Sequence, residues 1–305
     1  MSINTLVEMI RYKGNPTVAG LDARLEYIPE HIVRRHLMLH GETLRAAAES
    51  IVEFNCGLID ALADVVPAVK PQAAYYELLG SYGAMALKET IDYAHARGLY
   101  VIADIKRNDI GATASAYAQA YIGKTRVGDT EIAPYGADSA TVNAYLGTDG
   151  IEPFLKECRA REKSIFVLVK TSNPSSGEFQ NRDMEGKPLY ARVAEMMAQW
   201  GEGLDTPSGY NQVGAVVGAT YPEEQKIIRA LLPRAYFLVP GYGAQGATAQ
   251  DIANAFNDDG LGAIVNSSRG IMCAWQKTGK NGEDYKDAAR AEAVRMRDEI
   301  VAAIR

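Results

Sequence analysis

The chain has 305 residues, of which 47% are hydrophobic and 23% are charged, and its formal net charge is −6. This composition is typical of a globular protein that is long enough to bury a sizeable core. The negative charge argues against a surface for nucleic acid or another polyanion, although it is compatible with a local basic pocket for one phosphate. We therefore expect no nucleic-acid partner.

The cysteines and the apolar runs bear on the cellular compartment. Three cysteines lie far apart in the sequence, at Cys56, Cys158 and Cys273. Their odd number and their spacing argue against a disulfide framework or a cysteine metal site, and they fit a reducing cytoplasm. The first residues lack the apolar core of a signal peptide, and no run reaches the roughly 18 apolar residues that a membrane span needs. We therefore expect a cytoplasmic protein without a membrane partner.

Hydrophobic periodicity predicts helices and strands in regular alternation along the chain. The first half is expected to contain a helix at 5–13, a strand at 18–22, a helical stretch at 29–62 with a break near 40–42, a strand at 65–70, a helix at 75–97 that ends at Gly98, a strand at 99–103 and a helix at 112–122. The second half is expected to contain strands at 140–143, 164–170, 213–217, 236–239 and 263–266, and helices at 151–161, 188–200, 223–232, 249–257 and 284–304.

Eight strands that alternate with helices predict an α/β fold of the (β/α)8 TIM barrel type. We expect residues 1–305 to form a single domain, with extra segments at the N-terminus, in the fifth loop and at the C-terminus. The long polar loop at 173–187 is expected to be a partial lid or rim, with a flexible insertion as the alternative. A doubly wound sheet is the alternative, but no GxGxxG follows the first strand.

The strand at 99–103 leads directly into acidic and basic residues. Because strand side chains alternate between faces, Asp104 and Lys106 should point the same way, and Asp109 should follow in a turn. Charged groups at the carboxyl end of a strand are where α/β enzymes carry their chemistry. The alternative is a structural ion pair with Asp109 as a helix N-cap.

Other strand ends add to this charged set and to a candidate anion site. Asp22, Lys70 and Ser172 should reach the same rim, where alternating charges would keep one another ionised and form a fixed field for catalysis. The last two loops are rich in groups that suit phosphate binding. Their candidate residues are Gly241, Gly243, Gln245, Ser268 and Arg269.

These residues resemble the orotidine 5'-phosphate decarboxylase family. The match rests on residues 104–110, which fit the family's D-x-K-x-x-D-I signature. It is supported by Asp22 after the first strand and by Lys70 after the second. It is also supported by Pro240-Gly241 with Gln245, and by Arg269. The chain is similar to the longer bacterial subgroup, and the resemblance extends over all eight expected strands.

The resemblance implies loss of CO2 from orotidine 5'-phosphate to give UMP, without a metal or organic cofactor. Asp104 would lie against the substrate carboxylate, and Lys106 would stabilise and protonate the C6 carbanion. Lys70 and Asp22 would hold the ribose and the charged network. Asp109 would come from the partner subunit of a homodimer.

The resemblance also assigns the remaining contacts. Thr113 would face the partner's site, and Ser172 would contact the pyrimidine, with Thr171 left open as the alternative. Gln245 and Arg269 would grip the phosphate, Gln245 from a loop that closes over the substrate. Gly241, Gly243 and Ser268 would line the phosphate site.

Three alternatives stay open at this point. The first is a Mg²⁺-dependent phosphosugar enediolate enzyme of the same superfamily, of the hexulose-phosphate synthase or keto-gulonate-phosphate decarboxylase type. The second is a Schiff-base aldolase that uses Lys106 or Lys170, and the third is a non-catalytic nucleotide-binding barrel. The four histidines lie away from the expected strand ends, and we expect surface or packing roles for them: His31, His36, His40 and His95.

Overall fold

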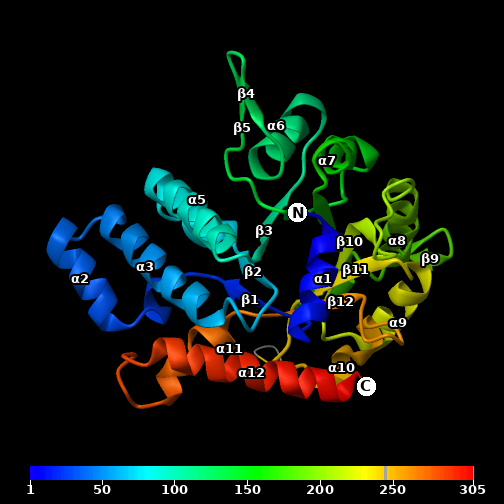
Figure 1. Ribbon diagram of the computed structural model, residues 1–305. Coiled ribbons are helices and arrows are strands. Elements are labelled where there is room, and N and C mark those ends of the chain that lie inside the picture. The colour runs from blue at the N-terminus through cyan, green and yellow to red at the C-terminus, as the bar shows by residue number, and fades with distance from the viewer. Residues whose placement is uncertain (244–245, 305) are drawn as a thin grey trace.

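The computed structural model describes residues 1–243 and 246–304 and contains a closed, parallel barrel with helices around it (Figure 1). The order of neighbouring strands is β1-β12-β11-β10-β7-β6-β3-β2, which confirms the expected (β/α)8 architecture. The barrel strands are β1 (Thr17–Leu21), β2 (Ala68–Pro71), β3 (Tyr100–Arg107), β6 (Ser139–Val142), β7 (Ser164–Lys170), β10 (Asn211–Val217), β11 (Ala235–Val239) and β12 (Ala263–Ser267).

The helices lie mainly outside the barrel and cover its outer face (Figure 1). They are α1 (Ile3–Lys13), α2 (Glu30–His40), α3 (Leu44–Leu62), α4 (Ala73–Glu77), α5 (Gly80–Ala96), α6 (Gly111–Tyr121), α7 (Thr148–Arg161), α8 (Leu189–Trp200), α9 (Pro222–Leu231), α10 (Ala249–Ile252), α11 (Arg269–Met272) and α12 (Tyr285–Ala303). Because helices cover a parallel sheet, its strands are apolar on both faces, and β1, β11 and β12 are buried along their whole lengths.

Helix α1 closes one end of the barrel. Its apolar residues recur at helical spacing, and the four that are buried are Ile3, Leu6, Val7 and Ile10. They pack in one core cluster with residues from the amino-terminal parts of the strands, including Val18, Ala68 and Tyr100. The backbone N–H of Ile3 also donates to Ser164 Oγ, at the first residue of β7. The amino ends of the strands are therefore covered, and the site lies at their carboxyl ends.

Several boundaries differ from the expected ones. The helix expected at 75–97 is two helices, because the chain turns at Gly80, whose φ is +58°. The helix expected at 249–257 is α10 followed by a 3-10 turn, Ala253–Ala255. Strand β3 continues to Arg107, beyond the expected end at residue 103.

Two short hairpins were not predicted. The first, β4 (Thr125–Val127) with β5 (Thr130–Ile132), projects from the barrel after α6 (Figure 1). The second, β8 (Asp183–Met184) with β9 (Lys187–Pro188), lies in the long fifth loop, which also contains a 3-10 turn, Pro174–Glu178. Within the described ranges, no helix combines the length and the apolar character that crossing a membrane requires.

Candidate active site

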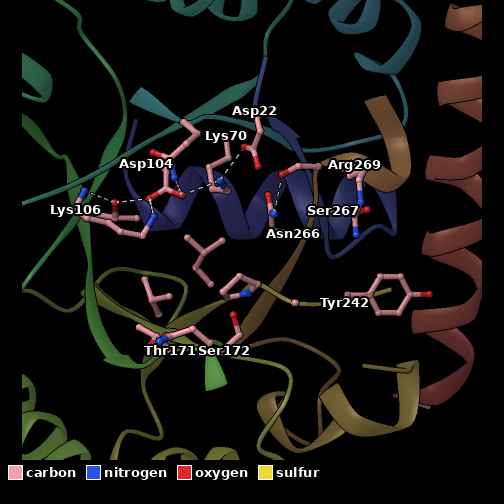
Figure 2. Close-up of a pocket in the computed structure, with 18 of the residues that line it drawn as sticks. Asp22, Lys70, Asp104, Lys106, Thr171, Ser172, Tyr242, Asn266, Ser267 and Arg269 are labelled. Atoms are coloured by element: carbon pink, nitrogen blue, oxygen red, sulfur yellow. Dashed lines mark hydrogen bonds and ion pairs between the residues drawn. The ribbon is translucent and has the colours of Figure 1, made fainter. Parts of the chain in front are cut away.

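A cavity of about 660 Å³ lies at the carboxyl ends of the barrel strands and gathers charged residues from three of them (Figure 2). Asp22 follows β1, Lys70 belongs to β2, and Asp104 and Lys106 belong to β3. Thr171, Ser172 and Arg269 line the same cavity. The expected convergence of the strand-end residues is therefore observed for all of these side chains.

The carboxylate of Asp104 is the centre of the charged network. Lys70 Nζ donates to Asp104 Oδ2 at 2.8 Å, and Lys106 Nζ donates to Oδ1 at 2.5 Å. Two neutral donors complete its environment, since Gln72 Nε2 lies 3.0 Å from Oδ2 and Thr141 Oγ1 lies 2.8 Å from Oδ1. With four donors around two oxygens, the carboxylate is fixed in position and cannot rotate without losing hydrogen bonds.

The charges of this network hold one another ionised. Burial disfavours the charged form of Asp104, but Lys70 and Lys106 outweigh it and hold the pKa of Asp104 well below its ordinary value. Burial likewise opposes the charge on Lys70, but Asp104 and Asp22 outweigh it, so the pKa of Lys70 is raised. Lys70 Nζ lies between these acids, 3.8 Å from Asp22 Oδ1. The side chain of Lys70 is 4% exposed, whereas that of Lys106 is 44% exposed.

Thr141 in β6 shapes the backbone that carries Lys106. The register between β3 and β6 shifts between Ala103 and Arg107. Within this irregularity, Thr141 Oγ1 accepts hydrogen bonds from the N–H groups of Ile105 and Lys106, each at 2.9 Å. Lys106 has a φ of +48°, a left-handed conformation that is uncommon for a residue with a side chain. The hydroxyl thus replaces lost strand hydrogen bonds and holds a strained backbone beside the charged network.

The opposite wall of the cavity is formed by the ends of β11 and β12. Gly241, Ser268 and Arg269 line it, together with Asn266, whose side-chain Nδ2 donates to Ser268 Oγ at 3.2 Å. A Cβ atom on Gly20 would lie 1.9 Å from Ser268 Oγ, so the glycine in β1 allows Ser268 its position. Asn266 Oδ1 and Asp22 Oδ1 are buried polar atoms without a hydrogen-bond partner among the described residues. Such atoms on a cavity wall are suited to a polar ligand.

The loop after β11 connects this wall to the C-terminal helix. Tyr242 lines the cavity, and its hydroxyl donates to Glu299 Oε2 of α12 at 2.6 Å. Burial and the neighbouring carboxylate raise the pKa of Tyr242 to about 12. Gly243 lines a neighbouring cavity rather than this one, and its N–H donates to the carbonyl of Ala247. Gln245 lies outside the described residues.

The end of β7 supplies both candidates for contact with a base. Thr171 Oγ1 donates to Asn173 Oδ1 at 2.6 Å and accepts from Gln180 Nε2 at 2.8 Å. No hydrogen bond to the Ser172 hydroxyl is present within the described ranges. A Cβ atom on Gly218 would lie 2.8 Å from Ser172 N and Cα, so that glycine lets the two strand ends approach. Ser172 is therefore the better placed of the two for a ligand.

Lys170 lies apart from the cavity although it ends the same strand. It is fully buried, and its Nζ donates to Ser176 Oγ at 3.1 Å and to Asn181 Oδ1 at 2.7 Å. Its ammonium group also lies 4.2 Å from the centre of the Tyr221 ring. Burial lowers the pKa of Lys170. This lysine anchors the fifth loop and is not among the residues that line the cavity, which disfavours it as a Schiff-base residue.

Asp109 and Thr113 do not line the cavity of their own chain. Asp109 accepts a hydrogen bond from the N–H of Ile110, and Thr113 is exposed at the start of α6. Ile110 between them is 56% exposed. This segment therefore presents both polar and apolar groups to the outside of the chain.

Sequence reasoning missed several residues that line the cavity. They are Tyr27, Gln72, Tyr75, Thr141 and Asn266, together with the apolar Leu168, Val216 and Leu238. Gln72 had a detectable signal, because it follows Lys70 by two residues and therefore lies on the same side of an extended chain. Thr141 had none, since a threonine in a short apolar strand is an ordinary β-branched residue.

Comparison with known proteins gives a consistent result. A model of the "Orotidine 5'-phosphate decarboxylase / HUMPS family" matches residues 31–280. A protein named orotidine 5'-phosphate decarboxylase from Rhodopirellula baltica is 43% identical over 291 residues, with 94% of each chain covered. Another of this name, from Clostridium perfringens strain 13, is 40% identical over 305 residues, covering 100% of this chain and 99% of its own.

A solved structure agrees with these sequence matches. The structure described as Leishmania donovani OMP decarboxylase is 31% identical, with a TM-score of 0.75, covering 100% of this chain and 99% of its own. The segment matched by the family model contains Lys70, Asp104 and Lys106.

Proposed function

The chain belongs to the orotidine 5'-phosphate decarboxylase / HUMPS family, and from this premise we propose that it decarboxylates orotidine 5'-phosphate to UMP and CO2, the last step of de novo UMP synthesis. The observation that carries the proposal is the Asp22–Lys70–Asp104–Lys106 network at the mouth of the barrel. The reaction leaves a negative charge on carbon, and this network holds a cation at the cavity opening.

The substrate is proposed to span the cavity from one wall to the other. Its phosphate lies toward Gly241, Ser268 and Arg269, and its ribose lies near Asp22 and Lys70. The pyrimidine contacts Ser172 and the apolar floor formed by Leu168, Val216 and Leu238. The Oδ1 atoms of Asp22 and Asn266, which lack a hydrogen-bond partner among the described residues, support this polar occupant.

The chemistry needs a negative group beside the substrate carboxylate and a proton donor beside C6. Asp104 stays ionised because Lys70 and Lys106 hold its pKa down, so it repels a carboxylate placed next to it. When the C6–carboxylate bond breaks, CO2 leaves and its bonding electron pair remains on C6. The Lys106 ammonium stabilises that charge and then transfers one proton to C6, which yields UMP and a neutral amine. No electron acceptor is required.

We also propose that the active unit is a homodimer in the cytoplasm, with residues 1–305 as one domain. Asp109 and Thr113 would complete the site of the partner, and their position outside their own cavity supports this arrangement. A second carboxylate near Lys106 would attract its ammonium group and help to position it. The free thiols of Cys56, Cys158 and Cys273 fit a reducing compartment.

The Mg²⁺-dependent alternative is disfavoured by the charge of Lys70. Its ammonium already lies 2.8 Å from Asp104 and 3.8 Å from Asp22, and it would repel a divalent cation placed between these carboxylates. A non-catalytic nucleotide-binding barrel is disfavoured because nucleotide binding alone needs no lysine–aspartate network, whereas burying Lys70 and Asp104 is costly in free energy.

The test is a direct assay of the purified protein with orotidine 5'-phosphate, in which loss of the orotate absorbance is followed in excess chelator. Turnover that is unchanged by chelation, with UMP as the product, supports the proposal. Loss of turnover on chelation, restored by Mg²⁺, would favour the enediolate alternative. UMP binding without turnover would favour the non-catalytic barrel.

A further inference from the structure

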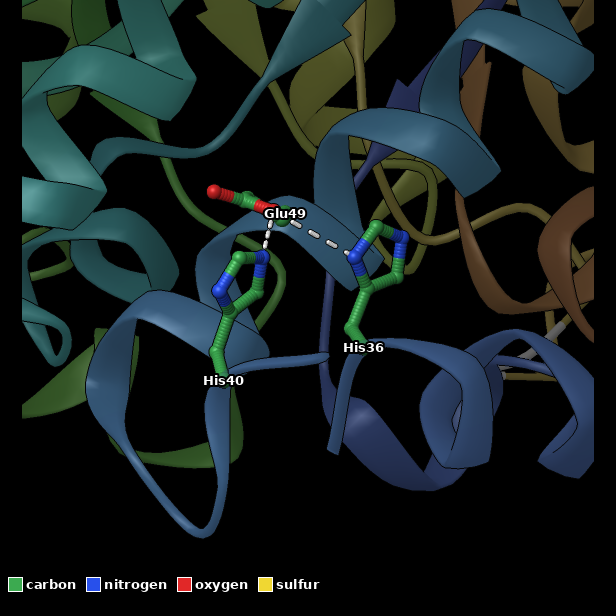
Figure 3. Close-up of side chains that lie close together, drawn as sticks. All are labelled: His36, His40 and Glu49. Carbon is green, nitrogen blue, oxygen red and sulfur yellow. Dashed lines mark ion pairs between the residues drawn. The ribbon is translucent and has the colours of Figure 1, made fainter. Parts of the chain in front are cut away.

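Two histidines of α2 and a glutamate of α3 lie close together (Figure 3), and none of them lines the active-site cavity. His36 and His40 lie one turn apart on α2, and Glu49 lies on α3. His40 Nε2 is 2.6 Å from Glu49 Oε2, and His36 Nδ1 is 3.4 Å from the same oxygen. All three ligand atoms lie within 4.8 Å of one another.

From this geometry we propose that His36, His40 and Glu49 form a binding site for a divalent transition-metal ion of the Zn²⁺ type, which links α2 to α3. Two imidazoles and one carboxylate are a usual protein ligand set for zinc, with a water in the fourth position. At zinc bond lengths, two ligands of a tetrahedral site lie about 3.3 Å apart. The two histidine–glutamate separations of 2.6 Å and 3.4 Å lie close to this value, and side-chain rotation can bring the three ligand atoms to bonding positions.

The hydrogen bonding of His36 provides a separate argument for a cation. Its Nε2 lies 2.9 Å from Glu53 Oε2, so that nitrogen is already engaged by a carboxylate. Its Nδ1 is buried, has no hydrogen-bond partner among the described residues, and lies 3.4 Å from Glu49 Oε2. This nitrogen and this oxygen can be bridged either by a second ring proton or by a bound metal ion.

The residues around the cluster complete the pattern of a metal site. Glu53 orients His36 through its second ring nitrogen, as carboxylates commonly do for metal-bound histidines. Arg35 Nη1 holds the other oxygen of Glu53 at 2.6 Å. Arg45 Nε holds the second oxygen of Glu49 at 2.8 Å, which leaves Oε2 directed at the histidines.

The position of the cluster indicates what a bound ion would do. Helix α2 buries only Ile32, while Met38 and Leu39 are 87% and 66% exposed. Its apolar packing is therefore slight, and a metal shared with the well-buried α3 would cross-link it to the barrel. The proposed role is structural and is separate from the chemistry of the cavity.

The test uses the full-length protein, stripped with chelator and titrated with ZnCl2 by calorimetry and with CoCl2 by visible absorbance. We expect one site per chain, and at least a tenfold weaker affinity in both His36→Asn and His40→Gln. His31→Asn is the matched control, because His31 lies on the same helix outside the cluster, and it should bind like the wild type.

The proposal is overturned if the wild type shows no saturable site at micromolar zinc, or if neither cluster variant binds more weakly than His31→Asn. Should both cluster variants fail to fold, hydrogen exchange of the wild type decides. Slower exchange of the α2 amides on zinc addition supports the cross-link, and unchanged exchange overturns it.

Discussion

Replacing Thr141 by valine should damage both folding and catalysis through one missing hydroxyl. Valine has nearly the same shape, so the main loss is the oxygen that accepts from the Ile105 and Lys106 N–H groups and donates to Asp104. A buried donor left without a partner costs about 1–3 kcal/mol. Ile105 N–H is buried, whereas the Lys106 N–H is partly exposed and can recruit water, so we expect a loss of about 2–4 kcal/mol in the free energy of unfolding.

The effect on the reaction follows from the position of Lys106. Its left-handed backbone is held by Thr141, and an error of about 1 Å in a catalytic group can lower a rate about 100-fold. We therefore expect kcat for orotidine 5'-phosphate to fall about 100-fold in Thr141→Val. The KM should change much less, since the phosphate wall lies across the cavity.

The measurements are steady-state decarboxylation and urea denaturation, and Thr141→Ser is the matched control. Serine keeps the hydroxyl and loses one methyl group, worth about 1 kcal/mol, so it should retain most of the activity. Wild-type turnover in the valine variant would refute the positioning role. Equal damage in the serine and valine variants would show that methyl packing, and not the hydroxyl, is responsible.

Four further outcomes are expected. Lys106→Ala should lower kcat at least about 10⁴-fold while UMP binding, measured by calorimetry, is largely retained; a near-normal rate would exclude this residue as the proton donor. Mixed Lys106→Ala and Asp109→Ala subunits should regain activity that neither has alone, and no recovery despite demonstrated subunit exchange would contradict a shared site. Because the folded-state pKa of Asp104 lies below its unfolded value near 3.9, its contribution to stability is present above about pH 4 and is lost as the pH falls further. Urea titrations should therefore show a smaller loss of stability between pH 5 and pH 3 in Asp104→Asn than in the wild type. Gly20→Ala should displace Ser268 and raise KM about tenfold, which corresponds to a loss of about 1.4 kcal/mol in binding free energy. An unchanged KM would mean that Ser268 can move without loss of substrate binding.

The barrel strands were predictable because each is buried on both faces and reads as an apolar run between polar loops. Their polar ends were predictable for the same reason, since Asp22, Lys70 and Asp104 interrupt apolar sequence and must share one rim. Asp104 and Lys106 were expected to point to the same face of their strand, and their side chains do form a direct hydrogen bond. They do so although a register shift interrupts the pairing of β3 with β6 at this point.

Features that depend on three-dimensional contacts could not be predicted from periodicity. The break between α4 and α5 separates two segments with continuous helical periodicity. The chain turns at Gly80, whose φ is +58°, and Gly83 then packs so closely on Tyr76 that a Cβ would lie 1.7 Å from its carbonyl oxygen. The role of Thr141 depends on a partner strand whose register is irregular. His36 and His40 were expected to be surface or packing residues, because nothing in the sequence shows that Glu49 folds back beside them.

The hydrogen bond between Tyr242 and Glu299 couples the position of the C-terminal helix to the binding of a ligand in the cavity. Tyr242 lines the cavity and also forms a hydrogen bond with α12. A ligand that binds more tightly when Tyr242 makes this hydrogen bond must therefore stabilise the packing of α12 on the barrel by the same free energy. Loosening α12 would accordingly weaken ligand binding through Tyr242, although no residue of α12 itself lines the cavity.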